Sequence, residues 1–154
     1  MNTPTAGGLL LVGQPNVGKS VLFHALTGRY VVVANYPGTT VEVSRGSART
    51  LGDMPVLDTP GVISLPSRTG DEHATTRALL TEKDVVLLQV GDAKNLRRSL
   101  QLTALFAEMG RPMVLAVNMV DEAEARGARI DTAALATELG LPVVATVATH
   151  GKGV

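Results

Sequence analysis

The sequence contains no cysteine, no excess of charge of either sign and no apolar run long enough to cross a membrane. Without cysteine, disulfides and thiolate metal sites are excluded. Lysine plus arginine number 14 and aspartate plus glutamate also number 14, so composition gives no support to a non-specific polyanion binder. The apolar runs, such as 85–90 and 114–117, have strand length, whereas a bilayer-spanning helix needs about 20 residues.

The remaining composition is that of one globular domain. The chain has 154 residues, of which 45% are apolar and 18% charged, and this suits a single domain with one substantial core. Residues 1–13 lack the basic start of a signal peptide, and their apolar run is too short for one. We therefore expect this stretch of chain to be soluble, and its lack of cysteine fits the cytoplasm.

Apolar runs rich in valine and leucine alternate with segments of helical character, which predicts an α/β fold with a mostly parallel central sheet and flanking helices. Long loops are expected at 28–40 and 61–70, Asp131 is expected to cap a helix, and Gly28 and Gly140 are expected to end helices. Strands are expected at 9–12, 41–45, 56–57, 85–90, 113–117 and 143–147, and helices at 18–26, 71–82, 95–109 and 131–139. Because a further helix would ordinarily cover the last strand, we expect residues 1–154 to be one domain truncated before its last helix.

Residues 13–20 match the GxxxxGK[ST] phosphate-loop pattern and lie between a predicted strand and a predicted helix. In this motif backbone N–H groups surround the phosphates, Lys19 reaches the terminal phosphates, and the Ser20 hydroxyl binds Mg²⁺. The alternative is a chance glycine loop with a surface lysine, but strand, loop and helix all agree with the motif. The predicted phosphate-binding residues are Gly13, Gln14, Pro15, Asn16, Val17, Gly18, Lys19, Ser20 and Val21.

A second motif, Asn118 to Asp121, follows a predicted strand and points to guanine. The Asp121 carboxylate can accept from guanine N1–H and the 2-amino group, a donor pair that adenine lacks. Asn118 can bond the other base edge and hold the loop, with Met119 beside it. As an isolated match, Asp121 would be more simply a helix N-cap. The backbone amides of Val147, Ala148 and Thr149 could contact guanine O6, although a plain turn explains this loop equally well.

The third motif is Asp58-Thr59-Pro60-Gly61, which directly follows a predicted strand. Asp58 is expected to hold Mg²⁺ through water, and the Gly61 N–H to meet the γ-phosphate. In the preceding loop, after Gly38, Thr40 is expected to complete the metal shell with its hydroxyl. Thr39 remains its competitor, and both threonines also suit entry into a strand.

Hydrolysis is expected to be slow because Val62 stands where many GTPases place a water-orienting glutamine. A valine side chain neither donates nor accepts, so we expect a turnover near the unassisted rate of about 10⁻⁴–10⁻³ s⁻¹. Lys19, Thr40, Gly61 and Asn16 are the predicted catalytic residues. From the residues alone, the Asn16 side chain is equally suited to ligate a monovalent cation or to cap its own loop.

The combination of motifs resembles the GTPase domain of the FeoB ferrous-iron transporters over essentially the whole chain. The segments that carry the resemblance are GQPNVGKSVLFHALTG, ANYPGTTVEVSRG, DTPGVISL, DEHATTRALL, DVVLLQVGDAKNLRRSLQLT and LAVNMVDEAEARG. It implies a Ras-like P-loop fold and potassium-stimulated GTP hydrolysis, with Asn16 at the potassium site and Thr40 as the switch threonine. It also implies a helical domain and a transmembrane iron permease downstream in a longer chain, on whose cytoplasmic side this domain would lie, and a possible homo-oligomer.

The leading hypothesis is therefore a GTP-binding and slowly GTP-hydrolysing domain that regulates or drives ferrous-iron uptake. A ribosome- or RNA-associated GTPase would share the motifs, but the zero net charge offers no basic extension, so no nucleic-acid partner is expected. A GTP-sensing switch with negligible hydrolysis is the third possibility, which Val62 leaves open because the groups that bind the ground state are intact. The histidines at 24, 73 and 150 are scattered without ligand spacing, so no transition-metal site is expected.

Overall fold

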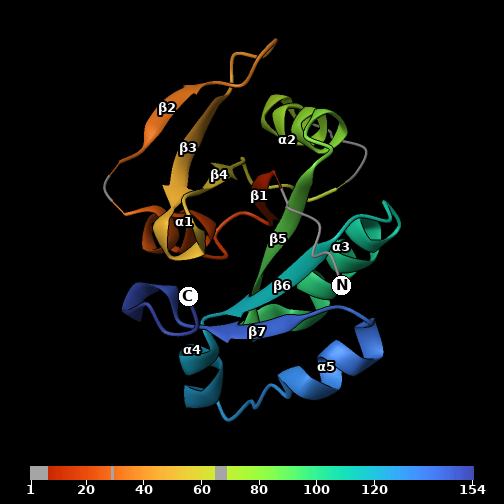
Figure 1. Cartoon of the computed structure of the whole chain (residues 1–154). Coiled ribbons are helices and arrows are strands. Elements are labelled where there is room, and N and C mark those ends of the chain that lie inside the picture. Colours follow the sequence, from red (N-terminus) through yellow and green to blue (C-terminus); the bar gives the residue numbers. More distant parts are fainter. Residues whose placement is uncertain (1–6, 29, 65–68) are drawn as a thin grey trace, which may run out of the picture.

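One seven-stranded sheet runs through the part of the chain that the computed structural model describes, residues 7–28, 30–64 and 69–154 (Figure 1). Its strands are β1 (Gly8–Gly13), β2 (Val32–Asn35), β3 (Glu42–Ala48), β4 (Met54–Asp58), β5 (Val85–Asp92), β6 (Met113–Asn118) and β7 (Val143–Thr146). They are ordered β2-β3-β4-β1-β5-β6-β7. The five strands from β4 to β7 pair in parallel, and β2 and β3 are antiparallel additions at one edge. The predicted fold class is confirmed.

Five α-helices connect these strands in the described residues, joined by three short 3₁₀ turns. The start of the second helix is fixed by a reciprocal capping box between Thr69 and Glu72. None of these helices is both long and apolar enough to cross a bilayer. The elements are α1 (Lys19–Thr27), α2 (Gly70–Thr81), η2 (Ala93–Asn95), α3 (Leu96–Ala107), α4 (Val120–Ala125), α5 (Thr132–Leu139), η1 (Arg49–Leu51) and η3 (Ala148–His150).

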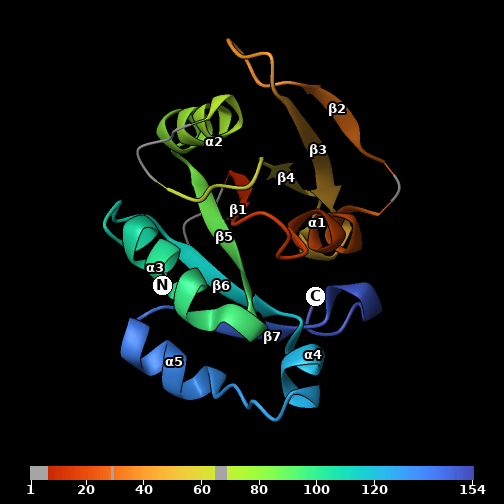
Figure 2. The same cartoon turned by 180° about the vertical axis from the view of Figure 1, so that it is seen from behind.

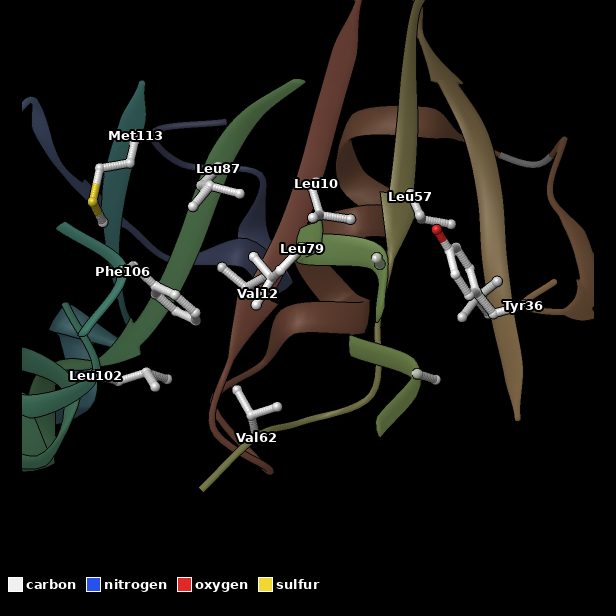
Figure 3. Close-up of a cluster of buried hydrophobic side chains, with 13 residues drawn as sticks. Leu10, Val12, Tyr36, Leu57, Val62, Leu79, Leu87, Leu102, Phe106 and Met113 are labelled. Carbon is white, nitrogen blue, oxygen red and sulfur yellow. The ribbon is translucent and has the colours of Figure 1, made fainter. Parts of the chain in front are cut away.

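Both faces of the sheet are buried, because successive residues of a strand point to opposite faces. On β1, Leu10 and Val12 join the core beneath α2 and α3, whereas Leu11 packs with Phe23 of α1 on the opposite face. Figure 3 shows the first of these clusters, in which Phe106 of α3 lies among side chains of the strands. Figure 2, turned by 180° from Figure 1, shows α2 and α3 from the other side of the molecule. The runs of Val and Leu in the sequence thus mark strands covered on both sides.

Two sequence predictions about elements were wrong. The loop expected at 28–40 contains β2, whose residues are all exposed, so no apolar alternation marks it in the sequence. It is a strand because it pairs with β3 in antiparallel register, for example Ala34 with Val43. The short helix α4 was not expected, because its six residues are too few to show a helical period.

The other expected elements are confirmed, with shifted ends. β3 continues to Ala48 and β4 begins at Met54, beyond the predicted strands, because they pair with each other over this range. Asp131 caps α5 by accepting from the Ala134 N–H, and Gly28 and Gly140 follow the last residues of their helices as expected. Residues 65–68 of the predicted loop at 61–70 lie outside the described residues.

The carboxyl ends of the parallel strands bring the three motifs to one edge of the sheet. Leu11 lies opposite Asp58, Gly13 lies opposite Val90, and Asn118 is the last residue of β6. Because ligands of open parallel sheets bind beyond these carboxyl ends, the fold itself gathers the predicted site.

Candidate nucleotide-binding site

The phosphate loop curves from β1 into the first turn of α1. Gly18 has a φ of 84°, in the left-handed region that glycine adopts without strain, and α1 begins at the next residue. Asn16 is also left-handed, with a φ of 65°, which asparagine tolerates better than most residues. The N-terminus of α1 therefore faces the loop, an arrangement that attracts anions.

A cavity of about 500 Å³ opens in front of this loop. Its wall comes from the loop, from the segment after β4 and from the β2–β3 hairpin. It thus combines the first and third sequence motifs in one space. Its lining residues are Gln14, Pro15, Asn16, Gly18, Lys19, Ser20, Val21, Val33, Glu42, Ser44, Asp58, Thr59, Pro60 and Gly61.

Lys19, Ser20 and Asp58 form a closed polar cluster at the base of this cavity. The Lys19 Nζ lies 2.5 Å from Asp58 Oδ1, and the Ser20 hydroxyl donates to Asp58 Oδ2 over 2.8 Å. Lys19 and Asp58 are 8% and 7% exposed, so the two charges neutralise each other away from water. The cluster places one ammonium and two oxygen ligands beside the space that the loop surrounds.

The segment after β4 is fastened to the phosphate loop. The Val62 N–H donates to the Gly13 carbonyl over 2.8 Å, and the Thr59 hydroxyl donates to the Leu11 carbonyl over 2.7 Å. A β-carbon on Gly61 would stand 2.7 Å from the Pro15 nitrogen, so only glycine fits this close approach. The Val62 side chain is fully buried in the core and cannot orient water in the cavity.

Asn118 ties the phosphate loop to the loop after β7. Its Nδ2 donates to the Val17 carbonyl over 3.1 Å, and its Oδ1 accepts from the Thr146 hydroxyl over 3.1 Å and from the Ala148 N–H over 3.0 Å. Asn118 is 2% exposed, so these bonds are shielded from water. The buried Asn118 side chain thus connects the phosphate loop to the loop after β7, although these two segments are more than a hundred residues apart in the sequence.

A second, smaller cavity of about 60 Å³ adjoins the first and shares Gly18 and Val21 with it. Asp121 is exposed here, and its carboxylate has no hydrogen-bond or ion-pair partner within the described residues. Met119 is left-handed and caps α4, so Asp121 is not the N-cap that an isolated motif would suggest. The lining residues are Gly18, Val21, Asn118, Met119, Asp121, Glu122, Val147, Ala148 and Thr149.

The loop that carries Gly38, Thr39 and Thr40 does not line either cavity. These residues border a groove against α2 together with His73 and Arg77. The Thr39 hydroxyl donates to the Tyr36 carbonyl over 2.9 Å and accepts from the Val41 N–H over 3.2 Å, and Thr40 is exposed. The two threonines therefore stand apart from the Lys19 cluster in this conformation.

Tyr36 anchors that loop to the end of α2. Its hydroxyl lies 2.5 Å from the Thr81 hydroxyl and donates to Glu82 Oε1 over 3.1 Å, and Tyr36 is 3% exposed. Burial raises the pKa of the Tyr36 phenol above its ordinary value. The loop is thus fixed against α2 by a buried aromatic side chain.

The oxygen ligands at the phosphate cavity suit Mg²⁺. A hydroxyl and a carboxylate, Ser20 and Asp58, already lie within 2.8 Å of each other, and hard oxygen donors are what this ion prefers. No group of three or more His, Cys, Asp or Glu residues that could hold a metal lies within the described ranges. The Asn16 side chain lines the same cavity and forms no hydrogen bond to its own loop there, which leaves its carbonyl oxygen available to a cation.

Sequence reasoning missed several residues that line these cavities. Val33, Glu42 and Ser44 face the phosphate cavity from the β2–β3 hairpin, which was predicted in part as loop. Glu122 lines the smaller cavity and pairs with Lys94 from a distant part of the sequence. No motif marks these residues, because the fold brings them to the site.

Comparison with known sequences identifies relatives over nearly the whole chain. A model of the family described as ferrous iron transport protein B matches residues 8–154. The Fe(2+) transporter FeoB of Salmonella typhimurium is 43% identical over 149 residues, which make up 94% of this chain and 19% of that protein. The chain thus spans about a fifth of the length of this relative.

Solved structures share the fold. A mutant of NFeoB from S. thermophilus, bound to GDP, has a TM-score of 0.89 and 37% identity over 95% of this chain and 57% of its own. The G domain of the T. maritima FeoB iron transporter has a TM-score of 0.87 and 38% identity over 95% of this chain and 90% of its own. The sheet and its helices therefore have the arrangement of these G domains.

Proposed function

The chain belongs to the family of ferrous iron transport protein B as its N-terminal G domain, and from that premise we propose that it binds GTP, hydrolyses it slowly and so switches ferrous-iron uptake. The P-loop GTPase fold accounts for the binding part of this activity. The GDP in the S. thermophilus relative supports the same class of ligand for this chain.

The observation that carries the proposal is the pair of adjoining cavities held together by Asn118. The larger one offers the phosphate loop and Lys19, and the smaller one offers the unpartnered Asp121 carboxylate. Because they share Gly18 and Val21, one ligand can place phosphates in the first and a base in the second. An acceptor pair at Asp121 favours guanine, because a bound base would cover the carboxylate, and a covered acceptor without a donor costs about 1–3 kcal/mol.

Lys19 is proposed to leave Asp58 and bind the terminal phosphates. Ser20 and Asp58 would then hold Mg²⁺, directly and through water respectively, and this ion offsets the charge of the phosphates. Thr40 would have to leave the groove beside α2 to join them. The segments 28–40 and 61–70 would then become ordered around GTP and loosen after hydrolysis, as in other GTPase switches.

Slow turnover is proposed because the side chain of Val62 is apolar and fully buried, so it cannot orient the attacking water. Asn16 would supply an oxygen to K⁺ beside the phosphates, where the added positive charge assists the developing negative charge. The Gly61 N–H would face the γ-phosphate. The role of Asn16 would make hydrolysis faster in potassium salts than in sodium salts.

The buried Val62 also favours a second candidate, a GTP-sensing switch with negligible turnover. Both candidates need the same ground-state binding groups, so binding does not separate them. Iron uptake is proposed for the longer protein, because the relative in which this chain covers 19% of the length is a Fe(2+) transporter. The permease segment and the cytoplasmic placement of this domain belong to that longer chain.

Isothermal titration of the 154-residue chain with GDP, GTP and ATP in the presence of Mg²⁺ tests the binding proposal. We expect saturable binding of both guanine nucleotides and at least hundredfold weaker binding of ATP. Equal affinity for ATP and GTP would contradict the guanine assignment. Absence of binding to any nucleotide would contradict the proposed function as a whole.

A further inference from the structure

Lys94, on the 3₁₀ turn η2 that follows β5, contacts two of the residues that line the smaller cavity. It lies within a segment that carries the family resemblance, but none of the three nucleotide-binding motifs includes it. Its Nζ donates to Glu122 Oε2 over 2.7 Å and to the Met119 sulfur over 3.0 Å. Its side chain is 17% exposed. A single ammonium thus contacts two residues that line the proposed base site.

Lys94 is itself held in place from β5. Asp92 accepts from the Lys94 backbone N–H over 2.9 Å, and its Oδ1 lies 3.6 Å from the Lys94 Nζ. The hydrogen bond to Glu122 is the main cause that raises the pKa of Lys94 above its ordinary value, so the ammonium stays charged. The side chain is therefore a fixed cation, anchored at both ends.

Met119 links this cation to the phosphate loop. Its methyl carbon would lie 3.3 Å from a β-carbon placed on Gly18, so the Met119 side chain reaches from Lys94 to the edge that both cavities share. A thioether is flexible and carries no charge. Its position therefore depends on what it contacts at either end.

The smaller cavity is lined by two carboxylates, and a cation nearby offsets their negative charge. Asp121 and Glu122 are neighbours in the first turn of α4, and both line the cavity. Two free carboxylates beside one base would repel each other and offer two competing acceptors. Lys94 binds Glu122 and leaves the Asp121 carboxylate without a partner in the described residues.

We propose that Lys94 is a positioning residue for guanine recognition, which holds Glu122 and Met119 so that Asp121 alone presents a carboxylate to the base. The inference rests on the proposed function, because it concerns the same site. It assigns to this chain a specificity determinant that reaches the base site from η2. Lys94 acts through Glu122 and Met119 and does not itself contact the base.

The test measures the affinity of the 154-residue chain for a fluorescent GDP, with GTP and inosine triphosphate as competitors, at low and high salt. Lys94→Met keeps most of the unbranched side chain and removes its charge. We expect about fivefold weaker GDP binding at low salt, a smaller loss at high salt, and a reduced preference for GTP over inosine triphosphate, which lacks the 2-amino group. Lys83→Met, at an exposed lysine between α2 and β5 at the opposite end of the sheet, is the matched control and should stay at the wild-type affinity.

The double variant Lys94→Met with Glu122→Gln makes the test specific. Because it removes the competing carboxylate together with the cation, we expect it to regain GDP affinity to within about twofold of Glu122→Gln alone. A merely structural lysine would show no such rescue. Lys94→Gln, which keeps a donor, is measured beside Lys94→Met in case the latter does not fold.

Each outcome decides the matter. If both folded Lys94 variants bind GDP as tightly and as selectively as the wild type, the inference is wrong while the proposed function stands. If the double variant is as weak as Lys94→Met, the charge-balance role is also contradicted. If the wild type itself does not bind GDP, the proposed function fails, and the inference fails with it.

Discussion

Lys19 and Asp58 form a buried ion pair at the centre of the phosphate cavity, with Ser20 as a third member. Each of the three groups has a second use in the proposed complex, Lys19 toward phosphate and the other two toward Mg²⁺. The pair keeps two charges neutralised at a site that is nearly closed to water. The same residues can therefore be stable together and still available for a polyanion with its cation.

Asp121→Asn should change the base preference of the site. The substitution replaces an acceptor pair by one acceptor and one donor, and xanthine carries an acceptor at C2 that matches the new donor. We expect GTP affinity to fall by about tenfold or more and xanthosine triphosphate affinity to rise. Competition binding with both nucleotides measures this, with Asp71→Asn, at an exposed position of α2, as control. Retained GTP selectivity would count against the base site.

Asn16→Ala should remove the effect of potassium. If the Asn16 carbonyl oxygen ligates K⁺ beside the phosphates, the wild type hydrolyses GTP faster in KCl than in NaCl, and the variant does not. The measurement is phosphate release in the two salts at equal ionic strength. Asn95→Ala is the control, because the Asn95 side chain does not cap its helix. A wild type that is indifferent to the salt would rule out the cation role.

At the residue scale, the sequence predicted the groups that belong to contiguous motifs. Lys19, Ser20 and Asp58 do converge, and Asn118 does bridge toward the final loop. The sequence could not predict Glu42 or Lys94, because their place at the site depends on the fold of β3 and of η2. Their neighbours at the site are tens of residues away in the chain, and no spacing rule connects them.

The loop before β3 and the helix α2 behave as one unit in this structure. Tyr36 fixes the loop to Thr81 and Glu82, and Arg77 donates to the Gly38 carbonyl over 3.4 Å. The two elements border a groove that is separate from the phosphate cavity. Movement of Thr40 toward Mg²⁺ would therefore have to strain or break the contacts with α2.

Tyr36→Phe should lower the free energy of unfolding by about 1 kcal/mol at pH 8, because it removes the hydroxyl bonds to Thr81 and Glu82. The raised pKa of the phenol means that the folded state holds its proton more tightly than the unfolded chain does. This contribution is complete below the ordinary pKa of about 10 and is lost as pH rises through the raised value. Urea unfolding of both proteins from pH 8 to pH 11 should show the difference shrinking above pH 10. Tyr30→Phe, at a position 79% exposed, is the control. A difference that stays constant over this range would contradict the role of the phenol.

Elements with long apolar runs could be predicted from the sequence, whereas β2 and α4 could not. The long runs of β1, β5 and β6 are buried on both faces and stand out in the sequence. β2 is an exposed edge strand that owes its existence to pairing with β3, and α4 is too short to show a period. β2 could not be predicted because it depends on pairing with β3, and α4 could not be predicted because it is short.

For the whole molecule, the chain covers 19% of the length of a Fe(2+) transporter to which it is 43% identical over 149 residues. We expect an antibody against this domain to detect a native product several times longer than 154 residues in the membrane fraction of the source cells. Extraction by detergent but not by high salt would distinguish an integral protein from an adsorbed one. A soluble product, or one that sediments with ribosomes, would leave the nucleotide site intact and contradict the transport role.

The most direct test of the central claim is GTP turnover by the purified chain with Mg²⁺ in KCl, beside the Lys19→Ala variant and a Lys83→Ala control. We predict slow release of phosphate by the wild type and the control, near the unassisted rate of about 10⁻⁴–10⁻³ s⁻¹ or modestly above it. Lys19→Ala, folded by circular dichroism, should show no measurable nucleotide affinity and no turnover, because the terminal phosphates lose their cation. Unchanged GTP binding or hydrolysis in Lys19→Ala would contradict the phosphate-loop assignment on which the account rests.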